Sequence, residues 1–148
     1  AIVHATSSAG TQAGLAAGLR LAGWSGVHLV GISADDPAAN IAGEVERILG
    51  EMEPLLSLET GALQQAIHVS DGFTGPGYGI PSAEGVAATQ LLARCEGIVL
   101  DPVYTAKAMA GLLAMVSGLP DGPVVFWHSG GQLASFLYDI SEIGLSIA

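Results

Sequence analysis

Short runs of apolar residues alternate along the chain with longer stretches in which apolar positions recur at helical spacing. The short runs predict strands at 1–5, 27–32, 66–69, 98–100 and 124–127. The longer stretches predict helices at 15–21, 37–54, 82–93, 105–116 and 132–138, and a further short helix at 55–63. Strands that are apolar throughout and separated by helices are typical of a parallel sheet covered on both faces. We therefore expect an α/β fold with a mostly parallel open sheet and helices on both faces.

Two segments near the middle of the chain carry further local signals. Ser82 has the residue type and position of a helix N-cap. The apolar side of the helix that follows is expected to hold Val86, Leu91, Leu92 and Cys95. Residues 72–81 contain four glycines and two prolines, which predicts an irregular loop. Tyr78 lies between two glycines of this loop and has little reason to pack, although a packing role is the alternative.

Three strand-to-helix loops are expected to meet at one edge of the sheet. Right-handed crossovers bring such loops to the carboxyl ends of the strands, which is where open α/β sheets bind ligands. The loops at 7–11, 101–105 and 129–131 should therefore form one site. Their side chains are hydroxyls and phenols rather than charged groups. These candidate residues are Ser7, Ser8, Thr11, Tyr104, Thr105 and Ser129, joined by Tyr78 of the glycine-rich loop.

The first of these loops leads from a buried strand into the start of a helix through small residues. A helix start exposes backbone N–H groups and a positive dipole end, and small residues let a phosphate approach the backbone closely. Hydroxyls of Ser7, Ser8 and Thr11 add donors, so the loop predicts a phosphate ester as ligand. The loop matches neither common nucleotide fingerprint, and an ordinary loop capped by Ser8 or Thr11 is the alternative.

Charged residues close to these loops have plain structural interpretations. Asp101 stands at a strand end directly before Pro102 and is expected to cap a turn, while Asp35 and Asp36 are expected in a solvated turn. Lys107 is the only lysine, so any Schiff base made by this polypeptide alone would have to use it. Its place on the first turn of a helix nevertheless favours an exposed cation.

Length, composition and charge narrow the classes of function. The 148 residues fit one domain, half of them are hydrophobic, and the mean hydropathy is +0.53. No apolar run reaches the roughly 18 residues that span a bilayer, so the surplus apolar surface is expected to meet another chain or domain. A net charge of −10 with only four Lys and Arg residues argues against nucleic acid and against anionic membrane surfaces.

Cysteine and histidine content argues against disulfide frameworks and metal sites. Cys95 is the only cysteine and is expected to be inert among the apolar residues of its helix. The four histidines are scattered without the spacing of metal ligands, so no metal is expected. The first residues lack the basic region and apolar length of a signal peptide, and a cytoplasmic location is the expectation.

Four motifs along the chain point to a known family. They lie at 8–14 (SAGTQAG), 75–81 (GPGYGIP), 101–109 (DPVYTAKAM) and 128–131 (HSGG). Together they resemble the C-terminal part of the D-cysteine desulfhydrase and 1-aminocyclopropane-1-carboxylate deaminase family, which are pyridoxal-phosphate enzymes of the tryptophan-synthase β-like fold. The resemblance covers essentially the whole chain. It implies that residues 1–148 form a single partial domain, the large-domain portion of that fold.

The resemblance also implies roles for the converging residues. The loop matching Ala9, Gly10 and Thr11, together with Ser8, holds the phosphate of pyridoxal 5′-phosphate. Thr105 joins these cofactor-binding residues, and the hydroxyl matching Ser129 faces the pyridine nitrogen. Tyrosines matching Tyr78 and Tyr104 lie on the substrate side as catalytic residues, where Tyr104 would transfer a proton or orient the substrate.

The residue after the second tyrosine separates branches of the family. Thr105 stands where the deaminase branch tends to have glutamate. The resemblance therefore favours β-elimination of the desulfhydrase kind, in which a D-amino acid such as D-cysteine gives pyruvate, ammonia and sulfide. Deamination of 1-aminocyclopropane-1-carboxylate and racemisation of an amino acid are the alternatives within the family.

Part of the family's machinery has no counterpart here. The Schiff-base lysine and the segment that binds the substrate carboxylate belong to an N-terminal portion of the family, and Lys107 matches a different family lysine. The chain would then be one piece of a nicked or two-chain enzyme, a truncated form, or a degenerate product. We expect a separate N-terminal chain to supply the lysine and the assembled enzyme to be a homo-oligomer.

Two non-enzymatic alternatives stand beside this interpretation. A binding module would hold pyridoxal phosphate non-covalently without a partner chain and would turn over no amino acid. A structural remnant would pair with a related enzyme and bind nothing. The tyrosines and the Gly10-Thr11 turn weigh against the remnant, because they have no evident packing purpose.

Overall fold

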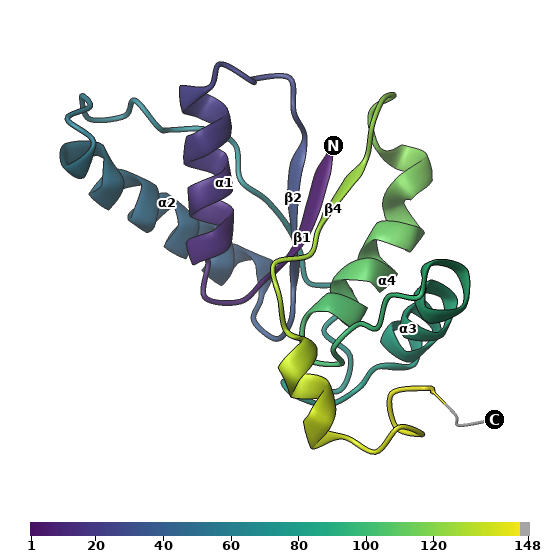
Figure 1. Cartoon of the computed structure of the whole chain (residues 1–148). Helices are drawn as coiled ribbons and strands as arrows, with labels where there is room; N and C mark the ends of the chain where they lie inside the picture. Colours follow the sequence, from purple (N-terminus) through teal and green to yellow (C-terminus); the bar gives the residue numbers. More distant parts are fainter. Residues whose placement is uncertain (146–148) are drawn as a thin grey trace.

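The computed structural model describes residues 1–145, in which four parallel strands are flanked by helices (Figure 1). The strands are β1 (Ile2–Thr6), β2 (Leu29–Ser33), β3 (His68–Ser70) and β4 (Val125–Trp127). The helices are α1 (Gly10–Leu21), α2 (Ala38–Leu55), α3 (Ala83–Glu96) and α4 (Thr105–Met115), with the 3₁₀ helices η1 (Val116–Gly118) and η2 (Gln132–Leu137). The predicted α/β class and parallel sheet are confirmed.

The order of strands across the sheet is β3-β2-β1-β4, and every neighbouring pair is parallel. The chain steps from β1 outward to β2 and β3, and then returns through α3 and α4 to place β4 on the other side of β1. Ile2 of β1 accordingly lies opposite both Leu29 of β2 and Val125 of β4. The direction of winding reverses between β1 and β4, and at such a switch point an open α/β sheet leaves a crevice for ligands.

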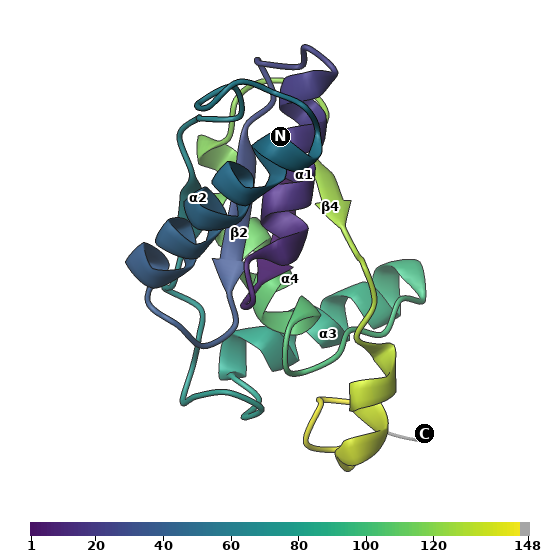
Figure 2. The ribbon, with the colours of Figure 1, turned by 90° about the vertical axis from the view of Figure 1, so that its left-hand side faces the viewer.

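Two apolar layers hold the helices against opposite faces of the sheet (Figures 1 and 2). The layer of α1 and α2 is built from Ala13, Ala16, Ala17, Ile41, Val45 and Leu49. On the other face α4 packs against β1 and β2, with α3 beside it. Gly111 allows this close packing, since a Cβ there would lie 2.9 Å from the Cδ1 of Ile32. Among residues 1–145, no helix has both the length and the apolar character that a bilayer crossing needs.

Two predicted elements do not form. Residues 98–100 were expected as a strand but stay outside the sheet, with Ile98 and Val99 exposed. β4 takes the place beside β1, and residues 98–100 pair with no strand in the described part of the chain. Residues 55–63 form turns rather than a helix beyond Leu55. The buried carboxylate of Glu53 accepts hydrogen bonds from the N–H groups of Gly61 and Leu63, each at 2.9 Å, and so folds this segment back onto α2.

The helix α3 begins as predicted, and the predicted apolar side is only half correct. The Ser82 hydroxyl caps the helix by accepting a hydrogen bond from the N–H of Gly85 at 3.0 Å. Val86 and Leu92 are partly buried, and Leu92 packs against the core, whereas Leu91 and Cys95 are exposed. The fully buried positions are the small residues Gly85, Ala88 and Thr89, which let α3 approach α4 closely. Cys95 is therefore a surface thiol, contrary to the prediction.

Candidate functional site

A cavity of about 260 Å³ lies at the carboxyl ends of β1 and β4, at the switch point of the sheet. Its walls come from the loop after β1, the start of α4 and the loop after β4. Of the predicted site residues, those that line it are Ser7, Ser8, Ala9, Thr11, Tyr104, Thr105 and Ser129. Gly10 opens α1 beside this wall. Tyr78 is not among the lining residues, but its hydroxyl is hydrogen-bonded to that of Tyr104. The predicted convergence of the three loops is confirmed, and the roles of the residues remain predictions.

The start of α1 presents backbone donors to this cavity. Ala9 is buried and adopts a left-handed conformation with φ of +63°, which is uncommon for a residue with a side chain. The N–H of Gly10 donates to the Ser8 carbonyl at 2.8 Å, and that of Ala13 donates to the Ala9 carbonyl at 2.9 Å. Within residues 1–145 the N–H groups of Thr11 and Gln12 have no acceptor, and no side chain caps the helix. The alternative of a loop capped by Ser8 or Thr11 is thus wrong.

The second wall is organised by a buried carboxylate. Asp101 is wholly buried and accepts hydrogen bonds from the N–H groups of Val103 (3.0 Å), Tyr104 (2.7 Å) and Thr105 (3.0 Å). The Thr105 hydroxyl also donates to this carboxylate and accepts from the N–H of Asp101 at 2.9 Å. Asp101 therefore caps the turn and the start of α4, as predicted. Gly131 packs against it so closely that a Cβ would lie 2.3 Å from Asp101 Oδ2, which joins the third wall to the second.

The two tyrosines of the candidate site form a pair. Their hydroxyls are hydrogen-bonded, and the rings meet edge to face with centroids 5.9 Å apart. The bond to Tyr78, with burial and the negative charges of Asp35 and Asp101, raises the pKa of Tyr104 to about 12. The Tyr104 phenol therefore bears its proton at neutral pH. Tyr78 is 57% exposed, so packing does not account for its position.

Lys107 contradicts the expectation of an exposed cation. It is fully buried, and its Nζ donates to the carbonyl of Ala34 at 2.9 Å and to that of Gly77 at 2.8 Å. Burial lowers the pKa of Lys107, and the nearby Asp35 partly opposes that effect. The first turn of α4 faces the end of β2 and the glycine-rich loop rather than solvent, which a helical pattern alone does not reveal.

Two further residues act differently from their sequence interpretation. Asp35 is not simply part of a solvated turn, because its carboxylate accepts a hydrogen bond from the Ser7 hydroxyl at 2.9 Å. Trp127 was not predicted as a site residue, yet it lines the cavity from the end of β4. Its position at the carboxyl end of a strand beside the switch point was the signal that would have found it.

The donor set fits a phosphate ester. The cavity walls contain the hydroxyls of Ser8 and Thr11 beside the unbonded backbone N–H groups of α1, while the Ser7 hydroxyl is already bonded to Asp35. Neither lysine nor arginine is among the lining residues described. A helix start of this kind binds phosphate through N–H donors and the helix dipole, without a cationic side chain.

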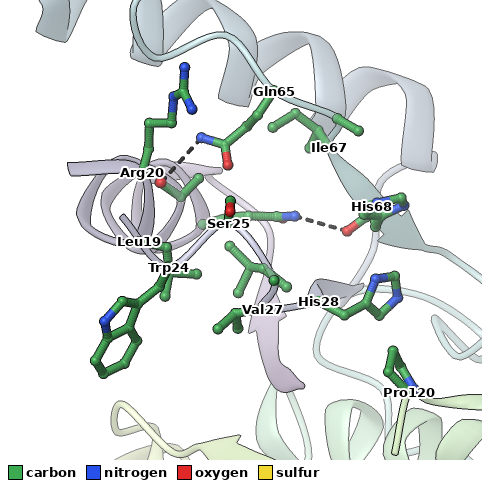
Figure 3. Close-up of a pocket in the computed structure, with 15 residues that line it drawn as sticks. Leu19, Arg20, Trp24, Ser25, Val27, His28, Gln65, Ile67, His68 and Pro120 are labelled. Carbon is green, nitrogen blue, oxygen red and sulfur yellow. Dashed lines mark hydrogen bonds between the residues drawn. The ribbon is translucent and has the colours of Figure 1, made fainter. Parts of the chain in front are cut away.

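A second hollow of about 350 Å³ lies at the opposite, amino-terminal end of the strands, between α1 and β3 (Figure 3). Three of its polar side chains, Gln12, Arg20 and Gln65, donate to the protein's own carbonyls. Gln12 Nε2 donates to the His68 carbonyl at 2.9 Å, and Gln65 Nε2 donates to the Ala16 carbonyl at 3.1 Å. The rings of His28 and His68 lie 4.7 Å apart, but no group of three or more potential metal ligands occurs in the described part of the chain.

Comparison with known proteins identifies the class of this chain. The model of the family described as pyridoxal-phosphate dependent enzyme matches residues 1–130, and the chain belongs to this family. The parallel α/β sheet described above is thus the fold of a pyridoxal-phosphate-dependent enzyme.

Two kinds of family member are similar to this chain. The D-cysteine desulfhydrases of Salmonella paratyphi C (strain RKS4594) and Salmonella typhi are 39% and 41% identical to this chain over 140 residues. Each alignment covers 93% of this chain and 42% of the relative. The crystal structure of a protein described as an ACC deaminase homologue matches with a TM-score of 0.85 at 29% identity, over 98% of this chain and 43% of that one. The chain therefore spans well under half the length of these relatives.

Proposed function

We propose that this chain is the C-terminal piece of a pyridoxal-phosphate-dependent lyase that carries out β-elimination on D-cysteine or a similar small D-amino acid. The products would be pyruvate, ammonia and sulfide. The observation that carries the proposal is the meeting of unbonded backbone donors and Tyr104 at one cavity at the switch point, with the Tyr78 hydroxyl bonded to that of Tyr104. The names of the desulfhydrase relatives support the choice of reaction.

The phosphate of the cofactor would be held by the start of α1. The N–H group and hydroxyl of Thr11, with Ala9, Gly10 and Ser8, supply donors on one wall. Ser129 on the facing loop would accept or donate at the pyridine nitrogen, and a neutral partner there leaves that nitrogen less protonated than a carboxylate would. Bound in this position, pyridoxal phosphate supplies the electron sink for chemistry at the α-carbon of an amino acid.

Tyr104 and Tyr78 would work on the substrate side. The raised pKa of Tyr104 keeps its phenol protonated, so it is suited to donate a proton to a departing group or to orient the substrate by hydrogen bonding. Tyr78 shares that proton through its own hydroxyl. Thr105 was predicted to bind the cofactor directly, but its hydroxyl already bonds twice to Asp101. We assign it instead to holding the Tyr104 turn at the cavity.

The lysine that carries the cofactor would come from another segment. Lys107 is buried and bonded to two carbonyls, which makes it unsuited to that role. Because the relatives are more than twice as long as the aligned region, an N-terminal portion, as the same or a separate chain, is the proposed source. The assembled enzyme is proposed to be a homo-oligomer, in keeping with the exposed apolar residues Leu133, Phe136 and Leu137.

The proposal is tested with the complete enzyme, obtained by expressing this chain together with the N-terminal portion. Denaturing mass spectrometry and the visible absorption spectrum establish the chain composition and the bound cofactor. Sulfide and pyruvate released together from D-cysteine are the expected result. Ammonia released from 1-aminocyclopropane-1-carboxylate, without turnover of D-cysteine, would replace this proposal with the deaminase alternative. Cofactor binding by this chain alone, with no turnover of any amino acid, would replace it with the binding module.

A further inference from the structure

Lys107 is wholly buried, and the function proposed above leaves it without a part to play. Its Nζ joins three segments that are far apart in sequence: the start of α4, the Ala34 carbonyl after β2, and the Gly77 carbonyl in the glycine-rich loop. The ion pairs found among residues 1–145 both involve Arg47, so Lys107 has no carboxylate partner there. A buried ammonium that bonds only to carbonyls is costly to maintain, which calls for a specific reason.

The surroundings of one acceptor, the Gly77 carbonyl, indicate a reason. Gly77 immediately precedes Tyr78, whose ring is more than half exposed and is flanked by glycines with φ of +151° and +71°. Glycines in such conformations leave the backbone free to move unless something else holds it. The loop is held on both sides of the tyrosine: Lys107 donates to the Gly77 carbonyl, and the Tyr138 hydroxyl donates to the Gly79 carbonyl. The position of Tyr78 therefore depends on its neighbours' anchors.

We propose that Lys107 is a positioning residue, whose buried ammonium holds the Gly77 carbonyl and thereby keeps the Tyr78 phenol against that of Tyr104. The anchoring itself stands on the hydrogen bonds, and its effect on catalysis rests on the function proposed above. A lysine suits this task because its long aliphatic stem crosses apolar surroundings and its ammonium carries three donors. Methionine, of similar length and shape, fills the same space but donates nothing.

A double-mutant cycle in the full-length holoenzyme tests the coupling. Lys107→Met and Tyr78→Phe are each expected to lower kcat about tenfold with a smaller change in KM. If Lys107 acts through Tyr78, the kcat of the double variant should lie no more than about twofold below that of the less active single variant. Leu112→Ala, in the buried part of the same helix, is the matched control. Leu112→Ala disturbs packing only. The fold-changes in kcat caused by Leu112→Ala and by Tyr78→Phe should therefore multiply when the two are combined.

Hydrogen exchange measured on the same full-length protein gives a readout that does not depend on turnover. The backbone amides within 75–81 (Pro76 and Pro81 have none) should exchange faster in Lys107→Met than in the wild type. The clearest probe is the amide of Ile80, which donates to the Gly77 carbonyl at 3.3 Å. In Leu112→Ala these amides should exchange as in the wild type. If Lys107→Met does not fold, Lys107→Gln, which is neutral and too short to reach both carbonyls, is held to the same criteria.

The outcomes separate the two proposals. Faster exchange of 75–81 in an enzyme that turns over no D-amino acid would retain the anchoring and overturn the proposed function. Unchanged exchange of this segment would overturn the anchoring whatever the activity. If the fold-changes in kcat of Lys107→Met and Tyr78→Phe multiply in the double variant, as expected for Leu112→Ala, Lys107 does not act through Tyr78. Lys107 would then contribute to overall stability only.

Discussion

The two ends of the sheet carry hollows of similar size but of different construction. The cavity at the carboxyl ends, about 260 Å³, lies beside the start of α1, where the backbone N–H groups of Thr11 and Gln12 have no acceptor among residues 1–145. The hollow at the amino ends, about 350 Å³, is walled by side chains such as Gln12 and Gln65 that bond to the protein's own carbonyls (Figure 3). The larger hollow thus uses its amide nitrogens within the protein and contains no helix start, although Gln12 Oε1 is buried there without a hydrogen-bond partner among residues 1–145.

The proposed site is therefore assigned to the carboxyl end by its unused backbone donors rather than by the volume of the hollow. The carboxyl end combines the start of α1, the Asp101 turn and the tyrosine pair because parallel strands bring their following loops to the same edge. At the amino end, preceding loops meet without helix starts, so only side chains are available there. Substitutions at the two ends should therefore separate into effects on chemistry and effects on stability alone.

The largest effect is expected from Asp101→Ala. Its carboxylate accepts three backbone hydrogen bonds and one from Thr105 in a buried position, so its loss should lower the free energy of unfolding by about 3–4 kcal/mol and abolish activity. Urea denaturation of the complete enzyme measures this change. Asp36→Ala in an exposed turn is the control and should alter stability by less than about 0.5 kcal/mol. A loss below 1 kcal/mol for Asp101→Ala, on the order of an ordinary surface change, would contradict its organising role.

Tyr104→Phe should lower kcat about 100-fold while the cofactor spectrum stays near normal. The variant removes the phenol proton that Tyr104 holds next to Tyr78, but leaves the phosphate-binding loop intact. Steady-state kinetics beside absorption spectra measure both properties. Trp24→Phe at the amino-end hollow should stay within about twofold of the wild-type rate. Equal losses of rate in these two variants would remove the distinction between the ends.

Thr11→Ala should weaken retention of pyridoxal phosphate about tenfold, since it deletes one hydroxyl donor at the helix start. Dialysis against a cofactor-free buffer, followed by titration with pyridoxal phosphate, measures the dissociation constant. Ser25→Ala in the other hollow is the matched loss of one hydroxyl and should leave retention unchanged. Retention that is the same in Thr11→Ala and Tyr104→Phe would count against this division of roles.

Gln65→Ala should produce the smallest effect, a loss of stability of about 1 kcal/mol without any change in cofactor binding or kcat. Its amide donates to the carbonyls of Ala16 and Leu63, which are structural partners only. Thermal or urea unfolding measures the loss, and kinetics verify that the site is unaffected. A drop in kcat with this variant would show that the amino end communicates with the cavity.

Most of the architecture follows from residue pattern, because strands and helices in this chain are short, regular and separated by clear turn residues. The pattern placed four of five strands correctly, and it brought Ser8, Thr11, Tyr104 and Ser129 to one edge through topology alone. Its errors arose where long-range contacts decide the outcome. The run 98–100 has strand composition but no partner strand among residues 1–145, and Glu53 binds residues 61 and 63 in place of a helix.

The sequence by itself determined the fold class, the loops that converge and the chemical type of their side chains, since these depend on periodicity and on the handedness of crossovers. Only the tertiary structure decided how single side chains are used. It buried Lys107 between two carbonyls, joined Tyr78 to Tyr104 and exposed Cys95. The first two depend on contacts between residues that are 26 or more positions apart in the sequence, and the third depends on which face of a helix packs against the core. The local sequence determines neither.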